Sequence, residues 1–472
     1  MEIRRVRPFI ALAAVSLAGL ALAGTAGAKV PVAFSTYKVG SLPDTPAAYN
    51  KVFVTKYGSP KAKKVLVLIP GTNGGAGNFS LLGPELASRV PGLQVWALDR
   101  REQALEDTSM MKKAAAGKAT GKQLLDYYLG WVLNPAQSPK FTPREAKDFQ
   151  FMKNWGMQMQ MDDARVVIRK AAAGGRTVIL GGHSLGASMA AGYAAWDFNG
   201  KPGYKDIAGI VAIDGGLSAS PDSEQGAEKA QADLAGLDLS ASNPDGPWLN
   251  LLRLPGFAWA TGPFAQIGAV AARQDPKGSS ILAGFPLLPA YLKPPGITPN
   301  NEAAVGYAFD YRTSPASLSL IQVRSGQLAA GGDPRGWQND GITPVQNVAS
   351  GFLGDRNGTN AVDWYYPRRL NVDSAGAGPM TADSPAGKVL GLRLYHLADV
   401  NIPYYAFQTS LSGSRNGVVN AAQNFAARSK VPKDRLVIVD RASTTSHLDP
   451  LLAAPKTNDF IKTVVPFLKK IR

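Results

Sequence analysis

Short runs of apolar residues recur along this chain, and each is bounded by turn-forming residues such as Gly, Pro, Asn or Asp. An apolar run of this length without a polar alternation is typical of a strand that is buried on both faces, as in parallel sheets. The pattern predicts six such strands: Val65–Ile69, Gln94–Leu98, Thr177–Leu180, Ile207–Ile213, Pro403–Phe407 and Arg435–Val439.

Helical patterns lie between several of these strands. Over 162–173 the apolar residues fall on one helical face, with Asp162 and Asp163 at the start and basic residues near the end, as the helix dipole favours. Small residues over Ala187–Ala195 predict a helix that packs closely on a sheet, and 458–471 predicts a last helix. Alternating strands and helices imply right-handed crossovers, so we predict an α/β fold with one doubly wound, mostly parallel sheet.

The stretch between the fourth and fifth predicted strands has a different texture. Residues 215–401 are rich in Gly, Pro, Asn and Asp, and their apolar clusters are irregular. We interpret this stretch as a large cap inserted into the sheet domain. The domain itself would then consist of residues 29–214 and 402–472.

The first 28 residues predict export. Three arginines precede an apolar run over 9–22, and the small residues Ala-Gly-Ala follow at 26–28. The run is shorter than the roughly 20 residues that a membrane-spanning helix needs, although an uncleaved anchor is the alternative. We therefore predict a signal peptide cleaved near Ala28 and a secreted protein, either extracellular or associated with a bacterial cell envelope.

Composition narrows the classes of function. With 45% hydrophobic and 18% charged residues, the 472-residue chain can bury a large core and is not of the disordered class. It has no cysteine, which excludes disulfides and thiolate metal sites. The formal charge of +16 favours contact with anionic lipid or cell-surface polymers. The basic residues are scattered, however, and we do not expect nucleic acid as a partner.

One motif carries specific chemistry. Residues 177–187 read TVILGGHSLGA, which is an apolar strand, the pattern G-x-S-x-G and the start of a small-residue helix. The pattern predicts a sharp turn that exposes Ser184, with a glycine two residues before and after it to make room. The free N–H groups of the following helix favour negative charge beside the serine. Ser184 is therefore the candidate nucleophile.

With this motif the chain resembles the α/β-hydrolase family, specifically its serine esterases and lipases. The resemblance covers most of 50–220 and 400–472, and it implies that Ser184 forms an acyl-enzyme. Because the motif carries serine where epoxide hydrolases and dehalogenases of the family carry aspartate, it argues against those two activities.

The resemblance also implies an oxyanion hole, which a loop after an early strand helps to form. Here that loop is Pro70–Gly77, and Pro70 stands where the family commonly has histidine. The donors in the family are backbone groups, so the role does not depend on that histidine. We expect the N–H of Thr72 or Asn73 to act together with the N–H of Leu185.

Only three histidines are available as the base. His447 follows the last predicted strand in a polar loop, and the family places its histidine last in the chain. We expect His183, inside the motif, to point away from the site and His396 to be structural. His447 is therefore the candidate general base.

The acid is less clear, because no carboxylate follows the strand Pro403–Phe407, where the family most often has one. Some lipases of the family place it one strand earlier, which implies Asp214, while Asp440 and Asp399 remain alternatives. The charged run Asp99–Glu102 we interpret as a solvated structural network, with ion pairs to the cap as the alternative. There is no HExxH and no histidine cluster, so we expect neither a metal nor a cofactor.

Taken together, these residues predict a serine hydrolase that cleaves carboxylic esters and whose partner is a small-molecule or lipid-like ester. Two alternatives stay open. One is an exported peptidase or a cell-envelope acyltransferase with the same nucleophile. The other is a non-catalytic binding protein on a hydrolase scaffold.

Overall fold

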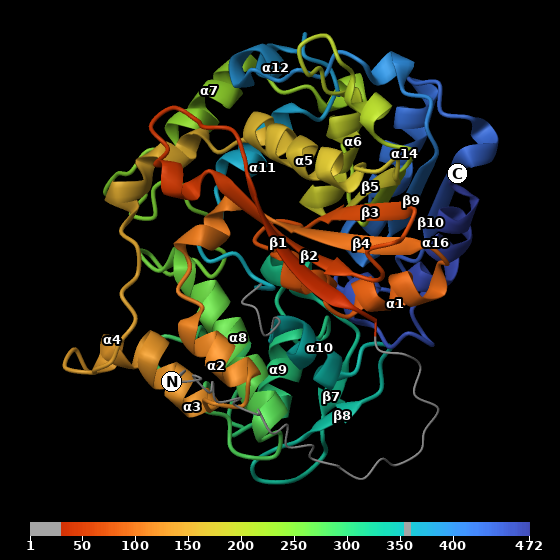
Figure 1. Cartoon of the computed structure of the whole chain (residues 1–472). Coiled ribbons are helices and arrows are strands. Elements are labelled where there is room, and N and C mark those ends of the chain that lie inside the picture. Colours follow the sequence, from red (N-terminus) through yellow and green to blue (C-terminus); the bar gives the residue numbers. More distant parts are fainter. Residues whose placement is uncertain (1–29, 354–359) are drawn as a thin grey trace, which may run out of the picture.

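One mixed eight-stranded sheet forms the centre of the protein (Figure 1). The computed structural model describes residues 30–353 and 360–472, so the predicted signal peptide lies outside the described residues. The strands of the sheet, in chain order, are β1 Val32–Lys38, β2 Lys51–Tyr57, β3 Lys64–Ile69, β4 Leu93–Asp99, β5 Thr177–His183, β6 Ile210–Ile213, β9 Tyr404–Gln408 and β10 Leu436–Asp440.

The order of the strands across the sheet is β1-β2-β4-β3-β5-β6-β9-β10. β1 pairs with β2, and β2 with β4, in the antiparallel sense, whereas every neighbouring pair from β4 to β10 is parallel. This order and these directions are those of the α/β-hydrolase fold, and the predicted fold class is confirmed.

Helices cover both faces of the sheet. The α-helices of the described residues are α1 Leu82–Arg89, α2 Ser109–Ala115, α3 Gly121–Leu125, α4 Trp131–Leu133, α5 Met157–Ala171, α6 Leu185–Ala195, α7 Ala227–Ala235, α8 Thr261–Gln274, α9 Asn301–Phe309, α10 Val345–Phe352, α11 Arg369–Gly376, α12 Pro385–Leu390, α13 Ser410–Gly413, α14 Gly417–Ala427, α15 Asp449–Leu452 and α16 Asp459–Lys470. In Figure 1, α5, α6 and α14 lie on one face, and α1 and α16 lie on the other. Within the described part of the chain, no helix is both long and apolar enough to span a membrane.

All six predicted strands are present. Five of them lie inside the sheet and are almost entirely buried, whereas the last, β10, lies at an edge of the sheet and is only partly buried. The sequence pattern missed β1 and β2. β1 is the edge strand at the other side of the sheet from β10, and most of its residues face solvent, so it has no continuous apolar run. In β2, buried residues mostly alternate with partly exposed ones, which is the pattern of a strand with one covered face.

The predicted helix at 162–173 begins five residues earlier, at Met157. Met157, Met159 and Met161 are all buried, and they extend the apolar face backwards by more than one turn. Asp163 is therefore not at the helix start. It lies inside the helix and forms a buried ion pair of 2.6 Å with Arg101.

The cap differs from the predicted single insertion, because it is built from two stretches of chain. Residues between β4 and α5, which were predicted to belong to the sheet domain, pack into one hydrophobic cluster with residues that follow β6. Phe141 from the first stretch contacts Trp259 and Trp364 from the second, with ring centroids 5.0 and 5.6 Å apart in edge-to-face arrangements. Such geometry is favourable for aromatic rings.

Part of the predicted cap belongs instead to the sheet domain. α11 and α12 follow the cap segment, and their residues Leu370 and Leu390 join the hydrophobic cluster that contains α5 and α6. In Figure 1 these two helices lie beside α5 and α7, away from the cap helices α8, α9 and α10. The chain between β6 and β9 thus covers the sheet as well as the candidate site.

Candidate active site

Ser184 lies in a sharp turn between β5 and α6 and adopts φ 56° and ψ −124°, a conformation that a residue with a side chain rarely takes. The turn is anchored on the neighbouring strand. The N–H of Ser184 donates to the carbonyl of Ile213 on β6 at 2.8 Å. A backbone held in this way presents the serine hydroxyl at the carboxyl end of the sheet, as a nucleophile elbow requires.

The glycines on each side of Ser184 are required by close packing. A Cβ atom on Gly182 would lie 2.2 Å from the carbonyl carbon of Gly186, and one on Gly186 would lie 2.0 Å from the oxygen of Ile69. Both distances are far below contact distance and involve backbone, which cannot move away cheaply. The glycine spacing of the motif thus has a steric cause in this structure.

His447 and Asp214 are joined by a buried hydrogen bond. The Nδ1 atom of His447 lies 2.5 Å from Oδ2 of Asp214, and the two side chains are almost inaccessible to solvent. An ionised carboxylate can only accept, so Nδ1 carries the proton and Nε2 keeps its lone pair. Nε2 makes no hydrogen bond to a described residue, and neither does the Ser184 hydroxyl. A neutral imidazole in this tautomer can act as a base.

The surroundings of Asp214 keep it ionised. Burial raises the pKa of this carboxyl, but hydrogen bonds from His447 and Thr409 outweigh burial and hold the pKa below its ordinary value. Thr409 donates its N–H to Oδ1 at 2.8 Å and its hydroxyl to Oδ2. Thr409 directly follows β9, at the strand end where the family most often has its acid, so this position supports Asp214 instead of replacing it.

The alternative acids lie elsewhere. Asp440 is exposed and accepts the N–H of Ala442, and Asp399 pairs with Lys430 at the surface. Neither contacts His447. Asp449 is buried two residues after His447 and accepts the N–H of Ser446 at 2.6 Å, so it shapes the loop that carries the histidine.

The place of His183 in the motif predicts that it points away from the site. In the structure it instead packs against His447. The two rings lie 4.3 Å apart, and Nε2 of His183 donates to the backbone carbonyl of His447 at 2.9 Å. Burial and the neighbouring His447 lower the pKa of His183 to about 3, so its ring is neutral. This neutral donor fixes the position of the His447 backbone.

The loop after β3 lies opposite Ser184. A Cβ atom on Gly71 would lie 2.8 Å from the Cβ of Ser184, which shows how closely the loop approaches. Asn73 adopts a positive φ of 56°. Among the described residues we find no acceptor for the N–H groups of Thr72 and Asn73. The N–H of Leu185 is the first of α6 and directly follows Ser184, and Thr72 and Asn73 line the same cavity as the serine.

Arg100 holds this loop in place. It is fully buried and donates to the carbonyls of Pro70, Gly71 at 3.2 Å and Gly74 at 2.9 Å. It also forms an ion pair of 2.9 Å with Asp363 of the inserted chain. The interpretation of the run Asp99–Glu102 as a solvated network is therefore wrong, and the alternative of ion pairs to the inserted chain is correct for Arg100.

Asp363 ties the same loop through its backbone. Its N–H donates to the carbonyl of Asn73 at 3.0 Å, and the side-chain amide of Asn73 donates to the Asp363 carbonyl at 2.7 Å. Burial raises the pKa of Asp363 to about 6 even though Arg100 opposes the shift. Glu102 is also buried there, and burial together with the charge of Asp363 raises its pKa well above the ordinary value.

Ser184, His447 and the loop residues Thr72 and Asn73 line one cavity, together with His183. Its remaining walls come mostly from apolar residues of the inserted chain, among them Leu252, Ala265, Phe309, Leu318, Ile321 and Phe352. Over residues 30–353 and 360–472, no cluster of His, Asp and Glu side chains is suited to hold a metal ion.

Comparisons with solved structures find similar chains at low sequence identity. The chain is similar in structure to a protein assigned as a lipase from Sulfolobus solfataricus, with 14% identity, a TM-score of 0.46, and 94% of this chain and 95% of the other covered. It is also similar to epoxide hydrolase A from Mycobacterium thermoresistibile, with 13% identity, a TM-score of 0.43, and 94% and 99% covered.

A haloalkane dehalogenase loop variant from Bradyrhizobium elkanii is similar at 12% identity and a TM-score of 0.37, with 93% and 97% covered. No model of a protein family and no curated protein sequence matches the chain.

Proposed function

We propose that this protein is an exported serine hydrolase that cleaves carboxylic esters through an acyl-enzyme on Ser184. The observation that carries the proposal is the hydrogen bond between His447 and Asp214, because it leaves the free nitrogen of His447 able to accept a proton. Export is proposed on the composition of residues 1–28 alone.

In the first half of the reaction, the Ser184 hydroxyl attacks the ester carbonyl while its proton passes to Nε2 of His447. The negative oxygen that forms accepts hydrogen bonds from the N–H of Leu185 and of Thr72 or Asn73. The carbon–oxygen bond then breaks, and the alcohol leaves with the proton that His447 held. Throughout, Asp214 stabilises the charged imidazole without taking its proton.

In the second half, a water molecule attacks the acyl-enzyme and gives one proton to His447. A second oxyanion forms and collapses, the bond to Ser184 breaks, and the serine oxygen recovers the proton from His447. The products are a carboxylic acid and the free enzyme.

The N-terminus of α6 directly follows Ser184, and the N–H groups of Thr72 and Asn73 have no acceptor among the described residues. Donors of this kind support an acyl-transfer reaction, because its intermediate carries a negative oxygen. The active-site cavity contains no Lys, Arg, Asp or Glu among its lining residues. That composition favours a neutral substrate over a peptide with charged ends. The absence of an acid after β9 supported a non-catalytic scaffold, but the contact between Asp214 and His447 removes that argument.

The proposal is tested with the purified protein, a fluorophosphonate probe, and matched ester and amide substrates of the same acyl group. We expect covalent labelling of the wild type and hydrolysis of the ester, with Ser184→Ala lacking both. Ser188→Ala is a suitable control, because Ser188 lies on the same helix and does not line the cavity. Labelling with turnover of amides alone would replace the esterase by a peptidase, and no labelling would refute a serine nucleophile.

A further inference from the structure

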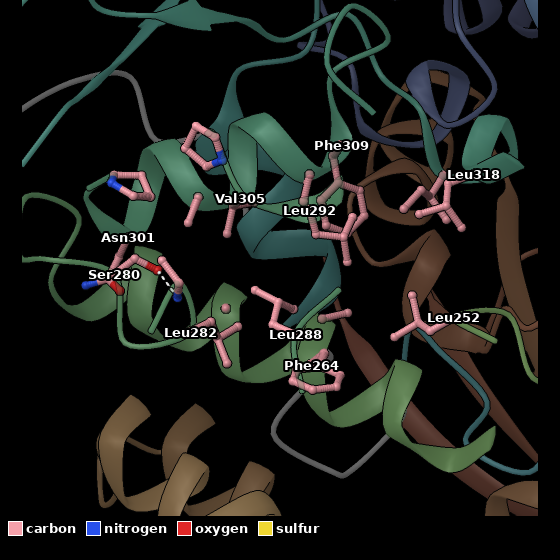
Figure 2. Close-up of a pocket in the computed structure, with 18 of the residues that line it drawn as sticks. Leu252, Phe264, Ser280, Leu282, Leu288, Leu292, Asn301, Val305, Phe309 and Leu318 are labelled. Carbon is pink, nitrogen blue, oxygen red and sulfur yellow. Dashed lines mark hydrogen bonds between the residues drawn. The ribbon is translucent and has the colours of Figure 1, made fainter. Parts of the chain in front are cut away.

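A second cavity, which we call the cap cavity, adjoins the active-site cavity. The two share six lining residues, Leu252, Thr261, Ala265, Phe309, Leu318 and Ile321. Figure 2 shows that the cap cavity is elongated, with Leu252 and Leu318 at one end and Ser280 and Asn301 at the other. The shared end is therefore the end nearest to Ser184, and the cavity extends from there into the cap.

The walls of the cap cavity are almost entirely apolar. Phe264, Leu282, Leu288, Leu292 and Val305 line its middle, and no charged side chain is among the lining residues. Binding of an apolar chain in an elongated cavity with such walls is favourable, because it removes apolar surface from water.

The polar groups at the far end are already engaged by the protein. Ser280 accepts the N–H of Ala283 at 3.2 Å, and Asn301 accepts the N–H of Ile281 at 3.1 Å while it donates to the carbonyl of Asp275. They hold the loop in shape and leave little capacity to recognise a polar group. A chain that reaches this end should therefore terminate in an apolar group.

The only other polar lining residue is Thr261, which belongs to the shared wall. Its hydroxyl is buried and has no hydrogen-bond partner among the described residues. The polar atoms of an ester substrate would also lie at this end, close to Ser184. The polarity along the cavity thus runs from an ester group at the shared wall to an alkyl end near Ser280.

We propose that the cap cavity binds a linear alkyl chain of the ester substrate, so that the protein acts on lipid-like esters with an uncharged chain. The inference rests on the function proposed above, and it adds the substrate class and the place where the chain lies. The chain belongs either to the acyl group or to the alcohol, and the experiment distinguishes these two sources.

The test blocks the cavity without touching the catalytic residues. Gly268 lies in α8 and lines the cap cavity only. A Cβ atom there would lie 3.3 Å from Leu282 and 3.6 Å from Val305, so the larger side chain of Gly268→Ile would enter the space between them. Gly284→Ile is the matched control, because Gly284 is exposed, has open space around it and does not line the cavity.

Two substrate series are measured: esters of one alcohol with acyl chains of increasing length, and acetate esters of alcohols of increasing length. For one of the two series, we expect kcat/KM of the wild type to rise by about fourfold per methylene until the chain fills the cavity. Gly268→Ile should lower kcat/KM for long chains by more than about tenfold and leave the shortest ester within about twofold. Gly284→Ile should behave as the wild type.

Should Gly268→Ile fail to fold, Ala304→Leu serves in its place, since Ala304 also lines only the cap cavity and is partly accessible. An unchanged chain-length preference in a folded blocking variant would overturn the inference, as would a wild type with no preference in either series. Failure of the proposed function looks different, because then no ester, not even the shortest, would be hydrolysed in a way that depends on Ser184.

Discussion

Replacing Asp214 by Asn changes one atom and tests the proposed role of this acid directly. Asp214 has a positive φ of 47°, a conformation that Asn tolerates well, so the backbone should stay in place. The N–H of Thr409 donates to one side-chain oxygen at 2.8 Å and will hold the oxygen of the new amide there. The amide nitrogen must then face Nδ1 of His447.

This orientation decides the tautomer of His447. The amide nitrogen can only donate, so Nδ1 must accept and the proton moves to Nε2. With its reactive nitrogen already protonated, His447 can no longer take the proton of Ser184. Since the equivalent change in a Ser-His-Asp triad lowers kcat by about 10⁴-fold, we expect a loss of 10³- to 10⁴-fold here, or about 4 to 5.5 kcal/mol in the barrier.

The assay measures kcat and KM on the preferred ester for wild type, Asp214→Asn, Asp440→Asn and Asp399→Asn. KM should change little in the three variants, because none of these aspartates lines the substrate cavity. The two surface variants should keep wild-type kcat. Full turnover in Asp214→Asn, or a comparable loss in Asp440→Asn, would show that the triad is assigned wrongly.

Two further predictions concern Arg100 and His183. Arg100→Lys keeps a positive charge beside Asp363 but loses most hydrogen bonds to the loop Pro70–Gly77. We expect kcat to fall by about 10²-fold, with KM nearly unchanged. The control Arg89→Lys, at an exposed position, should leave both constants as they are. His183 stays neutral in the folded protein but takes a proton below pH 6.5 when unfolded, so the free energy of unfolding falls as the pH drops. Between pH 7 and pH 5 the protonation of His183 lowers the free energy of unfolding by about 2 kcal/mol. His183→Gln keeps an N–H donor but has no titrating ring, so its free energy of unfolding, measured in denaturant titrations, should not show this decrease. Equal pH slopes, or an unchanged kcat for Arg100→Lys, would contradict these two assignments.

The core of the fold could be predicted from sequence because parallel strands buried on both faces leave continuous apolar runs. β3 and β5 are examples, and the elbow between β5 and α6 has a specific glycine spacing. The edge strand β1 has neither signal, because its stability depends on pairing with β2 and not on burial of its own side chains.

The candidate site could be predicted where chain order and residue type are informative, as for Ser184 and His447. The roles of His183 and Arg100 in positioning the site could not be predicted in the same way. His183 acts through a contact with a residue 264 positions away, and Arg100 through a partner 263 positions away. The charged run Asp99–Glu102 was a visible signal, but only the three-dimensional structure shows that it is buried and what it holds.

The division of the inserted chain between the cap and the sheet domain could not be predicted from the sequence either. A pattern of small and apolar residues does not say which surface a helix covers. Leu370 and Leu390 pack on the sheet domain, while Trp364, only six residues before Leu370, packs with the aromatic residues of the cap. The boundary between the two therefore falls within a few residues of Asp363.

The pairing of Asp363 with Arg100 and Asn73 has a consequence for engineering. A cap transplanted from another hydrolase would have to supply a carboxylate for Arg100, and a backbone N–H and carbonyl for Asn73, at the position of Asp363. Without them, the loop Pro70–Gly77 would lose its anchor. The residues around Gly268 contribute to the same anchor, because the buried Gln266 donates to Asn360 and accepts the indole N–H of Trp364, on either side of Asp363. Redesign of the substrate range should therefore keep Gln266 and Asp363 and change only residues that line the cap cavity.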